Sequence, residues 1–264
     1  MRPAYVTGLA LWSPGHRDLE SFVAGARDES VIDCSSPWVP PRLMRGASRL
    51  TRMLGEVACS ACASGGADPK TVSTIYTSSY GEIETMVILL DAIFAGDGQL
   101  SPMRFKNSVH NSASGLGSIG TGNQGFSTAL AAGDRSFEAA MIEAMVLLGE
   151  RGGDAVIAAA DDRLPAPLSA QCAREGLAIG MCLRSERPAG GAIAVIDGLQ
   201  QDDEEVTFGK MFAGRALPDA LAINPAAAAL PLIDALRAGV ERRVTLAYGA
   251  ARPFSVRVRP DVRD

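Results

Sequence analysis

Short runs of apolar, β-branched residues alternate with stretches of helical periodicity over the first two-thirds of this sequence, and that alternation restricts the possible folds most. Residues 4–9, 72–77 and 155–160 are such runs, and their length and composition predict buried strands. In residues 42–63, apolar side chains recur every three or four positions, which predicts a helix. Residues 134–148 carry a similar apolar stripe behind an acidic first residue. The alternation predicts a layered α/β fold around a largely buried sheet.

The remaining expected elements extend this pattern toward the C-terminus. Residues 177–183 and 192–196 predict a pair of strands, because a turn with proline and two glycines lies between them at residues 188–191. Further expected elements are helices at residues 81–94 and 226–237, and strands at residues 126–132, 244–248 and 254–258.

Composition and charge exclude several classes of function. The chain has 264 residues, of which 47% are hydrophobic, and this is enough to bury a substantial core. Its formal net charge of -5 gives no electrostatic footprint for nucleic acid. No segment has the length and apolar character of a membrane span, and the N-terminus lacks the layout of a signal peptide. Five irregularly spaced cysteines fit reduced thiols, so we expect a cytoplasmic protein.

Two short motifs match cofactor or metal patterns but lack the surroundings that such sites need. Gly115 to Gly120 matches GxGxxG, yet no strand leads directly into it, so close backbone packing is the favoured interpretation. Cys59 and Cys62 form a CxxC late in a predicted helix, where thiols behave as small buried hydrophobes. The sequence contains only two histidines, so no zinc site is expected. We therefore predict neither a cofactor nor a metal.

His110 is the residue whose role the sequence leaves open. It lies in a segment dense in glycine, serine and asparagine, where a single histidine is more often a hydrogen-bonded structural residue than a base. With Asp134 or Ser112 as its partner, His110 would instead serve a stand-alone acyltransferase or hydrolase. A GxSxG motif is missing, because the glycines around Ser118 miss that spacing by one residue.

Several stretches, in order along the chain, resemble the ketoacyl synthases of the thiolase-like fold. Residues 6–9 are similar to the opening strand of that family, and residues 108–115, Ser-Val-His-Asn-Ser-Ala-Ser-Gly, with residues 121–125, resemble the segment before its nucleophile. Residues 153–158 resemble the family's strand after the nucleophile helix, and residues 189–196 resemble its later glycine-rich hairpin. The likeness is greatest to ketoacyl synthase N-terminal domains and chain-length factors of aryl-polyene and type II polyketide systems. It covers residues 3–199.

The resemblance implies a thiolase-like layered α/β fold whose N-terminal half is complete and whose C-terminal half is shortened. It implies one domain over residues 1–264, with a ketosynthase-N-like core at residues 1–199 and a shortened C-terminal part at residues 200–264. Counting from Gly125, the family's catalytic cysteine falls on Asp134, and no cysteine of this chain is near that position. No histidine follows His110, so neither downstream catalytic histidine is present. We expect Asp134 to be a helix cap instead.

The function implied by the resemblance is that of a non-catalytic, chain-length-factor-like subunit without independent activity. Such a subunit pairs with an active ketosynthase through the strand at residues 126–132, and it meets an acyl carrier protein through the complex. An open sheet edge calls for such a partner or cover. A self-associating scaffold without an acyl pocket is a third hypothesis, beside the hydrolase or acyltransferase. The candidate tunnel and interface residues are His110, Asn111, Ser112, Leu116, Ile119, Phe126 and Thr128.

Overall fold

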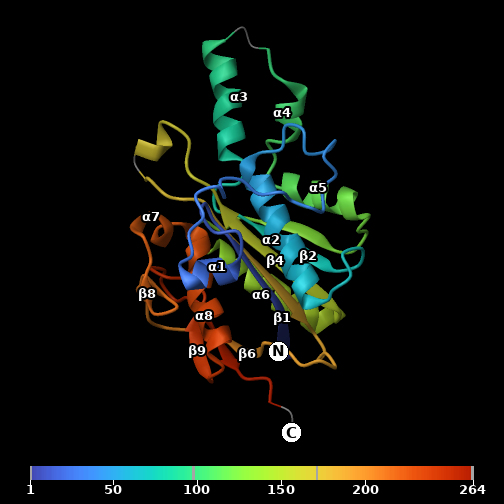
Figure 1. Cartoon of the computed structure of the whole chain (residues 1–264), viewed down its shortest axis with the longest axis vertical. Helices are drawn as coiled ribbons and strands as arrows, with labels where there is room; N and C mark the ends of the chain where they lie inside the picture. The colour runs from blue at the N-terminus through green and yellow to red at the C-terminus, as the bar shows by residue number, and fades with distance from the viewer. Residues whose placement is uncertain (1, 97–98, 171, 263–264) are drawn as a thin grey trace.

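The computed structural model describes residues 2–96, 99–170 and 172–262, which build a mixed eight-stranded sheet with helices on both faces (Figure 1). The strands run in the order β3-β2-β4-β5-β1-β6-β10-β9. Strand β2 is parallel to both β3 and β4, and the other neighbours are antiparallel. The strands of this sheet are β1 (Ala4–Trp12), β2 (Ser73–Thr77), β3 (Ser127–Leu130), β4 (Asp154–Asp161), β5 (Leu177–Arg184), β6 (Ala194–Gln201), β9 (Arg242–Thr245) and β10 (Phe254–Arg259).

The helices form two layers and a projecting arm. Helices α2 and α5 pack on one face of the sheet, while α1, α6 and α8 pack on the other. Helices α3 and α4 stand out from one end of the body, which we call the arm (Figure 1). Strands β7 (Met211–Phe212) and β8 (Arg215–Ala216) form a small separate hairpin. The helices are α1 (Leu19–Ala24), α2 (Arg49–Gly65), α3 (Ile83–Ala95), α4 (Pro102–Lys106), α5 (Ser112–Thr121), α6 (Ser136–Arg151), α7 (Asp219–Ala222) and α8 (Leu230–Ala238), with short 3-10 turns at Leu168–Ala170 and Pro225–Ala229.

Strand β4 illustrates how the sequence fixes this layering. Its side chains alternate between two hydrophobic clusters, because successive residues of a strand point to opposite faces. Ala155 and Ile157 belong to the cluster beneath α6, whereas Val156 and Ala158 belong to the cluster beneath α2. Both faces are apolar, so β4 is an uninterrupted apolar run, as expected for a strand buried on both sides.

Two glycines allow α2 to lie directly on the sheet. A Cβ added to Gly8 in β1 would overlap the carbonyl oxygen of Ala61, and one added to Gly180 in β5 would overlap that of Val57. Both carbonyls belong to α2, so the helix backbone touches the strand backbones at these two points. The abundance of small residues in the sequence therefore serves close contact between layers.

The glycine-rich segment that matches GxGxxG forms helix α5, and two of its glycines, Gly117 and Gly120, face neighbouring elements. An alanine Cβ at Gly117 would lie 2.7 Å from the Tyr76 hydroxyl, and at Gly120 it would overlap the carbonyl oxygen of Trp38. No strand precedes this helix directly; residues 107–111 form turns instead. This geometry agrees with close backbone packing rather than with a dinucleotide site.

Replacing Gly120 with Ala is expected to destabilise the chain by about 1–3 kcal/mol, because the added methyl group displaces the Trp38 backbone. Gly115 lies in the same helix, and nothing lies within 4 Å of a Cβ added there. Gly115→Ala is therefore expected to stabilise the chain by about 0.5–1 kcal/mol. Urea unfolding of both variants beside the wild type measures the two effects. Equal effects at the two positions would contradict the packing argument.

The structure corrects two details of the expected secondary structure. The strands at residues 177–183 and 192–196 do not pair, because β1 lies between β5 and β6 in the sheet. The helix expected over residues 42–63 begins at Arg49, because the Ser48 hydroxyl accepts the Thr51 N–H and caps it.

Candidate functional site

Strand β3 forms one edge of the sheet and is paired on a single side. It lies beside β2 in parallel register, with Thr74 opposite Ser127 and Thr77 opposite Leu130. Its other edge faces no strand in the described part of the chain. The Thr74 hydroxyl donates to the Ser127 hydroxyl at 2.8 Å and fixes this register. The exposed edge offers backbone N–H and C=O groups to another polypeptide.

His110 fastens the end of this strand to the segment that leads into α5. Its Nε2 lies 2.8 Å from the carbonyl oxygen of Leu130, and because a carbonyl only accepts, Nε2 carries the proton and donates. The other ring nitrogen lies against Gly81, where a Cβ would come within 2.5 Å of Nδ1. Gly81 has a φ of +54°, so glycine suits this position for two reasons. His110 thus joins β3, α5 and the base of the arm.

The three residues of the alternative enzyme do not form a hydrogen-bonded set. Ser112 is 8% exposed, and its hydroxyl has no hydrogen-bond partner within the described residues. Asp134 is exposed in the loop before α6, and His110 donates to a backbone carbonyl instead. A nucleophile and its base need a mutual hydrogen bond, directly or through one water, and the structure holds none among these three side chains.

The turn that carries Asp134 is stabilised by serine hydroxyls. The Ala132 N–H donates to the Ser136 hydroxyl at 3.0 Å, and that hydroxyl donates to the Gly133 carbonyl at 2.6 Å. The hydroxyl of Ser79 donates to the same carbonyl at 2.6 Å. The expected cap at Asp134 is wrong, because α6 begins two residues later and Arg135, its N-cap residue, makes no side-chain cap bond.

A small cavity of about 160 Å³ lies beside Asp134, and its other walls come from the C-terminal part of the chain. Phe208 and Tyr248 line it as an edge-to-face aromatic pair with ring centroids 5.3 Å apart. Asn224 and Pro225 line it as well. Residues 208–248 therefore line one side of the turn that carries Asp134, while Asp134 itself stays exposed.

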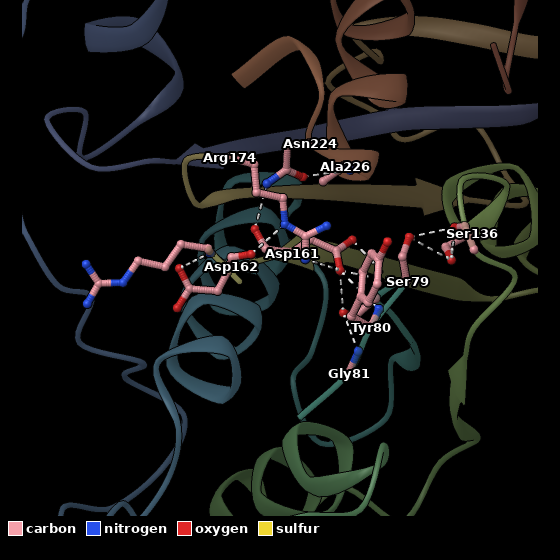
Figure 2. A network of polar contacts seen from close by, with 12 residues as sticks. Ser79, Tyr80, Gly81, Ser136, Asp161, Asp162, Arg174, Asn224 and Ala226 are labelled. Atoms are coloured by element: carbon pink, nitrogen blue, oxygen red, sulfur yellow. Dashed lines mark hydrogen bonds and ion pairs between the residues drawn. The ribbon is translucent and has the colours of Figure 1, made fainter. Parts of the chain in front are cut away.

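A buried polar network connects this turn with the base of the arm (Figure 2). Asp161, at the end of β4, accepts hydrogen bonds from the Ser78 hydroxyl at 2.9 Å and from the Ser79 and Tyr80 N–H groups at 3.0 and 3.3 Å. The Arg174 guanidinium lies 3.8 Å from its carboxylate and 4.4 Å from the centre of the Tyr80 ring. Each side chain of this ion pair is only 2% exposed. Burial raises the pKa of Asp161, although the hydrogen bonds and Arg174 act in the opposite direction.

The C-terminal part of the chain reaches the same network through Asn224. Its side-chain amide donates to the backbone carbonyls of Asp161 at 2.7 Å and Glu175 at 2.8 Å, and its oxygen accepts the Ala226 N–H. Because Asn224 is buried and all of these bonds are made, it holds residues 224–226 against the end of β4.

Glu82 supports the first turn of the arm from inside the body. Its carboxylate accepts the hydroxyls of Ser48 and Thr51, each at 2.7 Å, and that of Thr85 at 3.1 Å. Ser48 and Thr51 belong to the start of α2, so this buried cluster joins α2 to α3. Burial raises the pKa of Glu82 against the effect of the three hydroxyls. Glu82 therefore ties the first turn of α3 to the start of α2.

The arm presents a large apolar surface. Helix α3 carries only two charged residues, Glu84 and Asp91, and apolar residues fill most of its other positions. A helix of this kind is normally buried, and a contiguous exposed apolar patch marks an interaction site. Phe94 is 84% exposed and Phe105, in α4, is 64% exposed. The exposed large apolar side chains of the arm and its flanks are Tyr80, Met86, Ile88, Leu90, Ile93, Phe94, Leu100, Met103, Phe105 and Val109.

The candidate interface residues from the sequence lie at different depths. Asn111 and Ile119 are exposed, Ile119 to 67%. Phe126 is half-buried beneath the Arg151 guanidinium at 5.1 Å, and Thr128 is half-buried in β3. Leu116 is 6% exposed, so it packs inside this chain and does not reach the open edge. The sequence reasoning missed the arm, although the scarcity of charge between Ile83 and Phe94 was a signal for it.

Two further classes of site can be checked directly. Within residues 2–96, 99–170 and 172–262, no three His, Cys, Asp or Glu side chains are arranged to hold a metal ion. Over the same residues, no helix combines the length and the apolar character that crossing a bilayer requires.

Comparisons with known proteins agree on the fold. The ketosynthase ApeO in complex with its chain length factor ApeC, from Xenorhabdus doucetiae, matches with a TM-score of 0.67 and 20% identity over 98% of this chain and 100% of that chain. The ishigamide ketosynthase/chain length factor matches with a TM-score of 0.71 and 17% identity, covering 99% of this chain and 100% of that chain. A third match is a type II polyketide acyl-carrier protein in complex with its ketosynthase (AntDE:AntF), with a TM-score of 0.71 and 11% identity over 98% and 100% of the two chains. The expected thiolase-like fold is thereby confirmed.

Sequence comparison gives the family. No curated protein matches the chain. The family model described as "Beta-ketoacyl synthase, N-terminal domain" matches residues 21–222, which is more than half of the sequence. The chain therefore belongs to the family of beta-ketoacyl synthase N-terminal domains.

Proposed function

We propose that this chain is a non-catalytic, chain-length-factor-like subunit that pairs with an active ketosynthase during elongation of a polyene, polyketide or fatty-acid-like chain. Two features of the molecule carry this proposal: the open edge of β3, and an apolar arm whose first turn is held to the body through Glu82. Both features leave polar or apolar groups exposed that a second protein would cover.

The residues of the turn before α6, where the resemblance places the nucleophile, support the proposal that this chain has no condensing activity of its own. A ketosynthase needs a thiolate at the start of the helix that follows this turn. Here Asp134 is the expected nucleophile position, and no cysteine occurs between Cys62 and Cys172. No histidine follows His110, and the cavity beside Asp134 measures only about 160 Å³. An acyl chain would therefore be held in the partner rather than at this turn.

The partner in this proposal supplies the chemistry, and this chain supplies one wall of the acyl tunnel. The pairing of a ketosynthase with a chain length factor in two of the matching structures supports the choice of partner. Ile119, Phe126 and Thr128 are the candidates for the tunnel wall on this side, with His110 and Asn111 beside them. An acyl carrier protein would deliver substrates to the complex, and we place that complex in the cytoplasm. We also propose a single domain, with residues 200–264 as the shortened C-terminal part.

The experiment that tests this function is co-expression with the ketosynthase encoded nearest to it, followed by size-exclusion chromatography with light scattering. We expect a stable 1:1 complex, and condensation by the partner that depends on the presence of this chain. A monomer that ignores the ketosynthase would overturn the proposal. A homodimer that ignores it would favour the scaffold hypothesis.

The variant His110→Ala separates the subunit from the stand-alone enzyme. His110 holds the Leu130 carbonyl at the end of β3, so loss of its imidazole is expected to weaken pairing with the ketosynthase or the stability of the chain. The isolated chain is expected to have no catalytic turnover that this variant could remove. An acyltransferase or hydrolase activity of the isolated wild-type chain that disappears in this variant would contradict the proposal.

A further inference from the structure

Strand β1 has a strand neighbour on only one edge over its second half. Strand β5 pairs with it from Tyr5 to Trp12, but β6 pairs with it only from Ala4 to Val6. The Ile193 N–H donates to the Val6 carbonyl at 2.8 Å, and a β-bulge follows between Val6 and Gly8. From Gly8 to Trp12, no described segment pairs with the second edge of β1. Figure 1 shows β1 running between α1 and α2 in this region.

A groove of about 530 Å³ lies along this unpaired edge. Residues 7–11 of β1 form its floor, and Leu19 of α1 lines one wall. Val57, Ser60 and Ser64 of α2 line the opposite wall. The groove lies on a different part of the fold from the edge of β3, because β1 and β3 are separated by three strands of the sheet.

The backbone at the floor determines what can occupy the groove. A strand edge presents N–H and C=O groups at regular spacing, and buried groups of this kind need partners. An extended peptide satisfies them by adding a strand, whereas a lipid chain or a compact ligand does not. Residues 8–11 present about 13 Å of edge, at about 3.3 Å per residue. Leu9 and Leu11 alternate with smaller residues there and suit a peptide with apolar side chains at alternate positions.

Among the charged side chains of the groove, Arg17 is the one with donors left to offer to a carboxylate of that peptide. Asp18 is engaged in capping α1, Glu20 pairs with Arg237 at 2.6 Å, and Glu56 accepts hydrogen bonds from the loop before α2. Arg17 is exposed and makes no hydrogen bond or ion pair with the described residues, although it acts at longer range on Asp28. Three carboxylates and two guanidinium groups thus line the groove, and Arg17 is the one of these five whose hydrogen-bonding groups have no partner among the described residues.

We propose that this groove binds an extended peptide segment of a partner protein, which adds a strand to β1 and places a carboxylate beside Arg17. The proposal is independent of the pairing at β3. It assigns the chain a second contact, through which a tail or linker of another protein could be held close to the subunit.

Selection of phage-displayed random octapeptides on the full chain tests this assignment. We expect enrichment of peptides that alternate apolar and polar residues and carry an acidic residue near one end. On binding of a selected synthetic peptide, hydrogen exchange is expected to slow at residues 8–11. Methylation of the peptide nitrogens that face β1 is expected to abolish binding, because it removes the donors that pair with the strand.

Two variants and one control complete the test. Ser60→Tyr fills the groove and Arg17→Glu replaces the donors of Arg17 with a carboxylate, and each is expected to weaken peptide binding by at least about tenfold. Ala63→Tyr adds the same ring on an exposed position of α2 outside the groove and should leave binding unchanged. Thermal unfolding establishes that each variant is folded. Failure to enrich any peptide, or equal binding by all three variants and the wild type, would overturn the proposal.

Discussion

Replacing Arg174 with Met is expected to destabilise the chain by about 3–5 kcal/mol at pH 7, because it leaves the Asp161 carboxylate buried without its counter-ion. Methionine is close to arginine in length and is apolar, so the change removes charge and hydrogen bonding more than volume. The variant also loses the hydrogen bond from Nε to the Asp162 carbonyl at 2.8 Å and the stacking on Tyr80. Denaturation with urea measures the loss.

The loss in this variant should depend on pH. Burial already raises the folded-state pKa of Asp161, and removal of Arg174 raises it further, since the guanidinium was lowering it. A carboxyl whose pKa is higher in the folded than in the unfolded state contributes stability at low pH and loses that contribution as pH rises through the folded pKa. Lowering the pH from 7 toward 5 is therefore expected to restore part of the stability of Arg174→Met relative to the wild type.

The matched control is Arg163→Met, on the same loop. Arg163 is exposed, so its replacement is expected to change stability by no more than about 0.5 kcal/mol at either pH. A loss at Arg174 that equals the loss at Arg163, or one that grows as the pH falls, would contradict the assignment of a buried ion pair.

Local sequence patterns predicted the elements of this fold well, and the arrangement of those elements less well. The stripe formed by Phe137, Met141, Met145 and Leu148 predicted α6, and all four side chains are buried. In contrast, the turn at residues 188–191 suggested that β5 and β6 pair. That prediction used only residues close in sequence. In the sheet, β1, which comes from the start of the chain, lies between β5 and β6 and pairs with both.

The candidate site shows the same limit. The sequence placed the open edge at residues 126–132, because the resemblance to ketosynthases fixed that strand, and β3 does lie at the edge. The network around Asp161 could not be predicted, since Arg174, Tyr80 and Asn224 come from three separate segments that no short motif connects. The cap expected at Asp134 failed because the Ser136 hydroxyl organises the turn and the helix starts later.

Replacing Phe94 with Glu is expected to weaken pairing with the ketosynthase by about 100-fold, which corresponds to the 2–3 kcal/mol of a typical aromatic hot spot. Phe94 is 84% exposed in the isolated chain, so the substitution should leave the free energy of unfolding of the chain itself unchanged within about 0.5 kcal/mol. The expected loss is therefore confined to the complex, because only there would the charge be buried in an apolar contact.

Phe105→Glu, in the second helix of the arm, should reproduce this loss, and Val240→Glu is the matched control. Val240 is also a large apolar residue more than half exposed, but it follows α8, and Figure 1 shows α8 and β9 in the body, away from α3 and α4. Affinities of the co-purified ketosynthase for the three variants, measured by calorimetry, separate the outcomes. If both arm variants pair as tightly as Val240→Glu does, the apolar arm lies outside the interface, and pairing would have to depend on the edge of β3 alone. A loss of affinity confined to the two arm variants would show that the scarcity of charge in α3 serves binding of the ketosynthase. The exposed apolar side chains of α3 are not buried by any other part of the described chain.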